Sequence, residues 1–199
     1  MDFRNSLPGR RTFLGSLSLA PFFMTRGAFA QELTETPSCT EGPFYPDKMP
    51  LDTDNDLLMI NDAITPAVGE ITLLSGRVLK PSGEPVRNAF VEIWQCDARG
   101  RYRHPWAPGN DRVDPYFAGF GAVNTGSAGT YLFKTLIPVP YGGRPPHIHV
   151  KLFHANRELL ISQLYLRGQV SQYASQQMVI DPRSVGHNQW RADFHFVIA

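Results

Sequence analysis

The sequence predicts an all-β protein: a β-sandwich of mixed or antiparallel sheets that follows an irregular N-terminal arm. From Ile71 onwards, short runs rich in β-branched and aromatic residues alternate with turn sequences, and no run keeps the 3.6-residue period of an amphipathic helix. Seventeen glycines and seventeen prolines supply the turns. We therefore expect an arm of residues 31–70 and one sandwich domain of residues 71–199.

Six strands are expected in the domain. They are separated by turn sequences such as residues 81–85 and 125–129, in which glycine, proline and serine gather. The segment 169–179 fits either a short helix or a loop. The expected strands are residues 71–80, 89–96, 130–136, 147–153, 160–166 and 192–198.

The first thirty residues have the three parts of an export signal. Arg10 and Arg11 form a twin-arginine pair, an apolar segment follows at 13–24, and Ala28-Phe29-Ala30 is a small-x-small cleavage motif. A short amphipathic or buried helix is the alternative. The apolar segment is shorter than the roughly 20 residues of a membrane-spanning helix. We expect residues 1–30 to be a twin-arginine signal peptide, and the mature protein to be periplasmic or secreted, with no membrane span.

The charge of the mature chain excludes two classes of partner. The chain has 19 basic and 18 acidic residues, and residues 1–30 hold four arginines and one aspartate, which leaves 15 basic and 17 acidic residues. A chain that is weakly acidic has no field that attracts nucleic acid or an anionic membrane surface. The remaining length suits one domain with a full core.

Two cysteines, Cys39 in the arm and Cys96 at the end of a predicted strand, leave two alternatives open. An exported chain can keep a disulfide, and a bridge would tie the arm to the strand before Tyr102. Two unpaired thiols are the other alternative. The spacing of the two cysteines is not that of zinc ligands.

The segment from Tyr141 to His149 holds a phenol, a guanidinium and two imidazoles in nine residues. If it ends in a strand, the period of two places His147 and His149 on one face, where they can bind one metal ion. Arg144 lies between the phenol and the imidazoles, so its charge would lie beside whatever the metal binds. A His-x-His pair also arises by chance in alternating strands, and Tyr141 alone would be a packed aromatic residue.

A second tyrosine, Tyr102, follows the apolar run 90–94 and strengthens the case for a metal. Two phenolates and two neutral imidazoles carry two negative charges, and hard anionic oxygen favours iron(III) over zinc or copper(I). A bound cation lowers the pKa of its ligand, so a phenol that is neutral at pH 7 can bind as the phenolate.

The chain resembles the intradiol ring-cleavage dioxygenases, above all the iron-bearing subunit of the protocatechuate 3,4-dioxygenases. The resemblance runs from about Ile71 to Leu166 and depends on several motifs in the same order at compatible spacing. Residues 36–45 resemble the start of the iron-free subunit of those enzymes, so one chain combines features of both. The motifs are residues 91–95, 100–104, 110–112, 114–119, 144–149 and 163–165.

The resemblance implies a β-sandwich with the metal between its sheets. It implies that Tyr102, Tyr141, His147 and His149 bind non-haem iron, Fe(3+). A catechol would chelate this ion through its two adjacent hydroxyls, and Tyr141 would leave the ion and accept one of the protons. With dioxygen, the ring would break between the two hydroxylated carbons, which gives a muconate-type diacid.

The resemblance also implies roles for residues that do not bind the metal. Arg144 matches an arginine that stabilises negative charge on the ring. Gln163 matches a polar residue of the same pocket, with an exposed strand position as the alternative. Pro43 and Phe44 are candidates for the pocket lining, or they only anchor the arm.

The substrate and the assembly stay open at this stage. Only Gly142 and Gly143 separate Tyr141 from Arg144, where the protocatechuate enzymes have a longer loop. The expected substrate is a protocatechuate-like catechol together with O2, and the alternatives are plain catechol, hydroxyquinol or a larger aryl catechol. A non-catalytic exported module that binds an iron–catechol chelate is a third interpretation. Because one chain combines features of the iron-bearing and the iron-free subunit, we expect a homo-oligomer.

Overall fold

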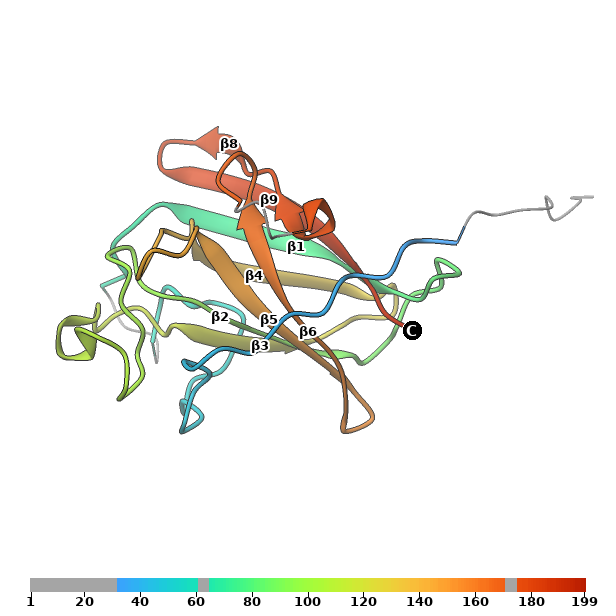
Figure 1. Ribbon diagram of the computed structural model, residues 1–199, viewed down its shortest axis with the longest axis horizontal. Coiled ribbons are helices and arrows are strands. Elements are labelled where there is room, and N and C mark those ends of the chain that lie inside the picture. Colours follow the sequence, from blue (N-terminus) through green and yellow to red (C-terminus); the bar gives the residue numbers. More distant parts are fainter. Residues whose placement is uncertain (1–31, 61–64, 171–174) are drawn as a thin grey trace, which may run out of the picture. The chain divides into compact units, whose positions relative to one another are not determined.

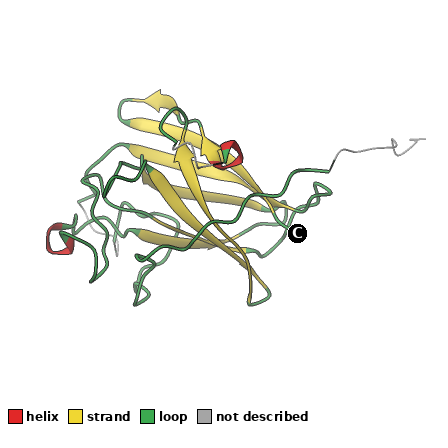
Figure 2. Ribbon diagram, viewed as in Figure 1, coloured by secondary structure: helices red, strands yellow, loops and turns green. Residues whose placement is uncertain are grey.

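The computed structural model describes residues 32–60, 65–170 and 175–199 (Figure 1). The predicted signal peptide, residues 1–30, lies outside the described residues. Strands and loops make up almost all of the described part, together with two single-turn 3-10 helices, η1 (Asn110–Arg112) and η2 (Gln176–Met178) (Figure 2). In this part of the chain, no helix is long and apolar enough to cross a membrane.

Two mixed sheets confirm the predicted all-β sandwich. In the first, β1 pairs antiparallel with β4 and parallel with β9; in the second, β5 pairs antiparallel with β2 and with β6. The first sheet has the order β4 (Thr130–Leu136), β1 (Ile71–Leu79), β9 (Gln189–Val197), β8 (Arg183–Gly186). The second has the order β3 (Phe120–Asn124), β2 (Phe90–Trp94), β5 (His147–His154), β6 (Arg157–Leu166), β7 (Val179–Ile180).

All six predicted strands are present, with ends that differ from the prediction by up to three residues. Three strands were missed, each for a physical reason. β3 has a glycine in its interior, which breaks the alternation of apolar and polar residues. β7 has two residues, and β8 is exposed along its whole length, so neither leaves a hydrophobic pattern. In the open segment 169–179, the described residues include the helix η2.

The main core lies between the two sheets, and the second sheet carries apolar residues on both faces. Leu74 of β1, Phe133 of β4 and Ile148 of β5 are among the fully buried residues of the main core. A separate apolar cluster lies on the other, outer face of the second sheet. It consists of Trp94, Cys96, Tyr102, Ala107, Phe120 and Ala122, with Phe44, Tyr45, Val139 and Tyr141 packed against them.

The arm runs over this outer face of the second sheet and is the blue segment of Figure 1. The backbone N–H of Cys39 donates to the carbonyl of Ile161 on β6 at 2.7 Å. Ser162 Oγ donates to the carbonyl of Pro37 at 2.8 Å. The arm is therefore a cover for the sheet, and what lies beneath it is shielded from water.

Candidate metal centre

Strand β5 places both histidines on the outer face of the second sheet, under the arm. His147 and His149 are 1% exposed, while Ile148 and Val150 between and after them are fully buried in the main core. The predicted same-face arrangement of the imidazoles is confirmed. The expectation of a site between the sheets is wrong, because apolar side chains fill that space and the histidines point away from it.

The two imidazoles are arranged so that their Nε2 atoms face each other. His147 Nδ1 donates to the carbonyl of Pro145 at 2.7 Å, which leaves a lone pair on Nε2. The Nε2 atoms of His147 and His149 are 3.1 Å apart. Burial lowers the pKa of His147 to about 4 and that of His149 well below its ordinary value, so both rings are neutral at pH 7. Neutral imidazoles are the form that binds metal, through the ring nitrogen that carries no proton.

Tyr102 lies at the end of a loop whose backbone is held in place by hydrogen bonds to the Asp97 carboxylate. Asp97 is buried, and its oxygens accept from the backbone N–H groups of Arg99, Arg101 and Asp114 at 2.9–3.0 Å. The Tyr102 hydroxyl is buried and has no hydrogen-bond partner among the described residues. Burial, and then the neighbouring Tyr141, raise the pKa of Tyr102 above its usual range. This phenol would ionise only with a cation beside its oxygen.

Tyr141 and Arg144 flank a tight turn that needs its two glycines. The N–H of Arg144 donates to the carbonyl of Tyr141 at 2.8 Å. Gly142 and Gly143 have φ values of 52° and 78°, in the left-handed region that other residues occupy only with strain. The short Gly-Gly spacing thus places the phenol and the guanidinium at the two ends of one turn.

The four predicted ligands form one cluster. Ring centres are 4.9 Å apart for Tyr102 and Tyr141, 5.4 Å for Tyr141 and His147, 4.7 Å for His147 and His149, and 6.1 Å for Tyr102 and His149. Each tyrosine therefore contacts one imidazole, and the tyrosines contact each other.

The cluster fits an iron(III) ion by the chemistry of its donors. The partnerless Tyr102 oxygen supplies a hard donor, and the Nε2 atoms of His147 and His149, 3.1 Å apart, are close enough to bind the same ion. Nowhere in the described part of the chain do three His, Cys, Asp and Glu side chains gather as a metal site. A metal ion here would therefore depend on the tyrosines.

Arg144 is held beside the cluster by Gln163 and by a residue that the sequence analysis did not single out, Tyr165. Gln163 Oε1 accepts from Arg144 Nη2 at 2.7 Å and from Tyr165 Oη at 2.6 Å. Gln163 is fully buried, so the alternative of an exposed strand position is wrong. In the β5–β6 pairing, Gln163 lies opposite His149 and Tyr165 opposite His147. Pairing the residues of β5 and β6 outward from the hairpin that joins them would have placed Tyr165 beside His147.

Trp94, the last residue of β2, also packs against this cluster. It lies opposite His149 in the β2–β5 pairing, and the two rings stack 4.7 Å apart at an angle of 10°. The indole covers one face of the imidazole and thereby restricts the orientation of His149.

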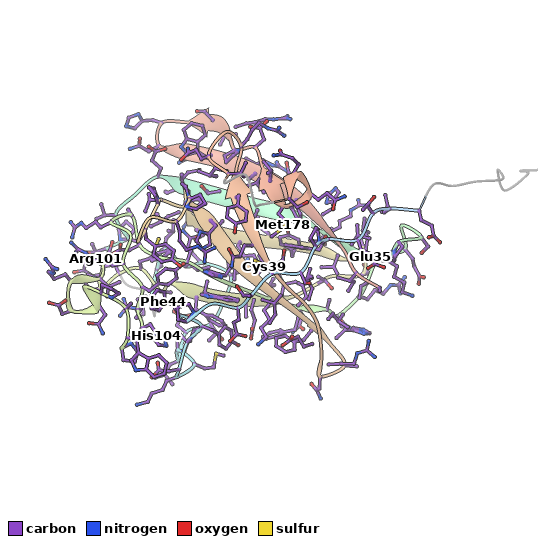
Figure 3. The ribbon with its side chains drawn as sticks, viewed as in Figure 1. Glu35, Cys39, Phe44, Arg101, His104 and Met178 are labelled. Atoms are coloured by element: carbon purple, nitrogen blue, oxygen red, sulfur yellow. The ribbon has the colours of Figure 1, made fainter. Side chains whose placement is uncertain are left out.

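The two arm residues predicted as pocket lining differ in their surroundings. The Phe44 ring lies 4.9 Å from that of Tyr102, 6.1 Å from that of Tyr141 and 5.7 Å from that of His104, and Phe44 and His104 are close together in Figure 3. Pro43 is exposed. Phe44 also lines a cavity of about 520 Å³ that reaches Tyr102, Trp94 and Phe120.

Both cysteines are free thiols, so the predicted possible disulfide is not formed. Cys39 lies where the arm meets β6 (Figure 3). The thiol of Cys96 lies 3.7 Å from the carbonyl of Val139. β5 lies between β6 and β2, the strand that Cys96 follows. Of the two alternatives left open by the sequence, the structure has the unpaired one.

Known proteins resemble the chain in sequence over part of its length. A protocatechuate 3,4-dioxygenase beta chain from Burkholderia cepacia is 40% identical over 111 residues, which cover 51% of this chain and 46% of that protein. Catechol 1,2-dioxygenase 2 from Acinetobacter lwoffii is 28% identical over 151 residues, 67% of this chain and 52% of that protein. The chain thus spans about half the length of these curated relatives.

A solved structure agrees with the fold and the family. The dioxygenase domain of a dioxygenase–carbohydrate-binding protein fusion from Streptomyces sp. SirexAA-E superposes with a TM-score of 0.67 at 26% identity, over 82% of this chain and 97% of that one. A family model described as Dioxygenase matches residues 40–144, more than half of the chain, and this stretch includes Tyr102, Tyr141 and Arg144. These matches show that the chain belongs to the intradiol ring-cleavage dioxygenase family.

Proposed function

We propose that this protein is a non-haem iron(III) dioxygenase that opens a catechol-type ring between its two hydroxylated carbons with O2, giving a muconate-type diacid. The observation that carries the proposal is the convergence of two buried imidazoles with two tyrosines, one of which has a buried oxygen without a partner. Family membership supports the same reaction class.

Tyr102, Tyr141, His147 and His149 would hold the iron(III) ion, which would supply Lewis-acid binding of the two catechol oxygens and activation of the ring toward O2. The protein supplies the proton transfers and the charge around this chemistry. Tyr102 is 3% exposed and enclosed by Phe44 and Tyr141, so it is suited to remain a ligand throughout. Tyr141 is only half-buried and is carried by a turn, so it is suited to swing away and take a catechol proton on its phenolate oxygen.

Arg144 has the position of an electrostatic stabiliser. Its guanidinium is fixed by Gln163 and Tyr165, so it does not need to reorganise when negative charge develops on the ring. Gln163 is itself anchored, because its amide nitrogen donates to the carbonyl of Thr40 at 3.1 Å. The arm and the second sheet therefore fix this charge together.

The substrate we propose is a protocatechuate-like catechol. The 40% identical relative is a protocatechuate 3,4-dioxygenase chain, which supports this choice, and the catechol 1,2-dioxygenase relative keeps plain catechol as an alternative. Hydroxyquinol and larger aryl catechols are the other two kinds of candidate substrate. Relative kcat/KM values of the iron-loaded protein for these four kinds of substrate decide among them.

Replacing Tyr102 with Phe tests the proposal directly. The change removes the ligand oxygen but keeps the ring that packs against Phe44, so kcat for oxygen uptake with catechols should fall by more than about 100-fold. Tyr116→Phe is the matched control, because Tyr116 is 39% exposed and lies outside the cluster. A Tyr102→Phe variant with full activity would contradict the proposal.

A module that holds an iron–catechol chelate without cleaving it is the competing function. Such a module consumes no oxygen, so oxygen uptake and the mass of the product separate the two. The fixed position of Arg144 beside the cluster favours cleavage, because binding alone does not require a stabiliser for negative charge that develops on the ring.

We also propose export by the twin-arginine route and assembly into a homo-oligomer. The Arg10-Arg11 pair and the following apolar segment support export. An Arg10→Lys, Arg11→Lys double variant should keep the protein in the cytoplasm, as cell fractionation would show.

The presence of the arm and all four predicted ligands in one chain supports self-assembly. Light scattering of the purified protein measures its mass in solution. The mass of a single chain would contradict self-assembly.

A further inference from the structure

Residues 42–44 of the arm touch three of the four predicted ligands. A Cβ placed on Gly42 would lie 3.3 Å from His149 Cε1, so the backbone of the arm passes close over the imidazole. The Phe44 ring packs against Tyr102 and Tyr141. This short segment is therefore one wall of the site, and its position decides the shape of the space beside the ligands.

Two contacts hold this segment at its two ends. Before it, Glu41 Oε2 lies 2.7 Å from Lys151 Nζ. After it, Tyr45 Oη donates to Glu92 Oε2 at 2.9 Å. Glu92 of β2 and Lys151 of β5 lie opposite each other in the strand pairing, so both anchors come from one rung of the second sheet.

Lys151 contacts both ends of the segment. Its ammonium pairs with Glu41 and lies 4.6 Å from the centre of the Tyr45 ring, within the range of a cation–π interaction. Glu158 Oε2 lies 3.3 Å away on the side of β6. The lysine side chain is only 12% exposed, whereas that of Lys80 in the Lys80–Glu84 pair is 51% exposed. Shielded pairs are screened less than exposed ones and contribute more.

The strand connects this anchor to the ligands. His147, His149 and Lys151 are alternate residues of β5 and share its outer face, with Ile148 and Val150 in the core between them. Lys151 is thus the next outward position after the second predicted ligand.

We infer that Lys151 is a positioning residue that holds residues 42–44 against His149, Tyr102 and Tyr141 through its contacts with Glu41 and Tyr45. Its effect on substrate rests on the proposed function, but its effect on the arm does not. Without Lys151, the arm loses the anchor at Glu41 and the cation at the Tyr45 ring, and the wall made by Gly42 and Phe44 loosens.

Amide hydrogen exchange in the metal-free protein tests the effect on the arm. Lys151→Met keeps the aliphatic stem and removes the charge, so exchange in peptides that cover residues 40–46 should become about tenfold faster or more. Lys151→Arg, which keeps the charge, should restore slow exchange. The control is Lys80→Met, which breaks an exposed lysine–glutamate pair far from the arm segment in sequence and should leave these peptides unchanged.

Steady-state kinetics of the iron-loaded protein test the effect on substrate. Lys151→Met should raise KM for the catechol about tenfold and change kcat by less than about threefold, because the groups that act on the ring remain in place. If the protein does not bind iron, the proposed function fails, and the exchange experiment still decides whether Lys151 positions the arm.

The inference is overturned if Lys151→Met exchanges like the wild type at residues 40–46, or if exchange rises equally in all peptides of the domain. Should Lys151→Met fail to fold, Glu41→Gln removes the same ion pair from the arm side and leaves β5 intact. Faster exchange at residues 40–46 in that variant supports the inference, and wild-type exchange overturns it.

Discussion

At the scale of single residues, the two predicted tyrosine ligands differ most in their surroundings. Tyr102 is buried, enclosed by aromatic rings, and follows a loop tied to Asp97. Tyr141 is half-buried at the start of a turn with no close packing around its two glycines. Identical phenols can thus take different roles, one as a fixed ligand and the other as a ligand that leaves and accepts a proton.

Arg144 gives a prediction about charge at the site. Arg144→Gln removes the cation but keeps an amide that can still bond to Gln163, so the fold and the iron site should remain. Because a preorganised charge that stabilises developing negative charge is typically worth a few kcal/mol, kcat should fall about 10²–10³-fold. The measurement is steady-state oxygen uptake with protocatechuate.

The matched control for Arg144 is Arg87→Gln, since Arg87 is exposed and lies before β2, away from the cluster. The visible absorption of the iron-loaded Arg144→Gln variant should resemble that of the wild type, because Arg144 donates no ligand atom. A variant with wild-type kcat would remove Arg144 from the mechanism.

Several single residues of the site could be predicted from the sequence because they carry distinctive chemistry. The imidazoles of His147 and His149, the two tyrosines and Arg144 were found from their types and spacing. Trp94 and Tyr165 were missed, because an aromatic residue in a strand has the same local pattern in a core and in a site. Only the strand pairing places them beside His149 and His147.

At the scale of elements, the turn between Tyr141 and Arg144 determines how these two residues approach the cluster. Its geometry depends on two positive φ values, at Gly142 and Gly143. A residue with a Cβ in the left-handed region costs about 1–2 kcal/mol. Gly143→Ala should therefore lower the free energy of unfolding by about that amount and also weaken iron binding, as urea unfolding and metal titration would measure.

A second glycine separates these two effects. Gly83 has a φ of 82°, close to the 78° of Gly143, and a methyl group added at either position would meet no atom within 4 Å beyond its neighbours in the chain. Gly83→Ala should cost similar stability and leave iron affinity unchanged. Equal iron affinity in the two variants would show that the turn does not position Tyr141.

The strands themselves were largely predictable, but the face on which the site lies was not. Alternation in β5 places His147 and His149 together, yet it does not say which face of the sheet meets the other sheet. The position of the arm shows which face holds the site. The arm is a polar, proline-containing segment with little sequence pattern, but its contacts with Ile161 and Gln163 cover the outer face. Contacts that join residues over a hundred positions apart leave no local signal.

At the scale of the whole molecule, one sheet serves two purposes. Its inner face completes the hydrophobic core, while its outer face and the arm enclose the predicted ligands. The site is therefore built on rigid strands and closed by a segment held by side-chain contacts. This arrangement predicts that metal binding and the stability of the folded domain are coupled.

Iron should stabilise the folded protein, because only the folded chain brings the four ligands together. A ligand at about 100 times its Kd adds about 2.7 kcal/mol to the free energy of unfolding. For a domain of this size, this corresponds to a rise in Tm of about 5–10 °C. Calorimetry with and without iron(III) measures the shift, and a chelator should reverse it. An unchanged Tm in saturating iron(III) would argue against a site formed by folding.

The most direct test of the central claim is the visible absorption spectrum of the purified protein without residues 1–30, reconstituted with iron(III), before and after anaerobic addition of protocatechuate. The account predicts a broad phenolate-to-iron(III) band that shifts when the catechol binds, followed by ring cleavage when oxygen is admitted. A protein that stays colourless after reconstitution would contradict it, because Tyr102 and Tyr141 would then not be ligands.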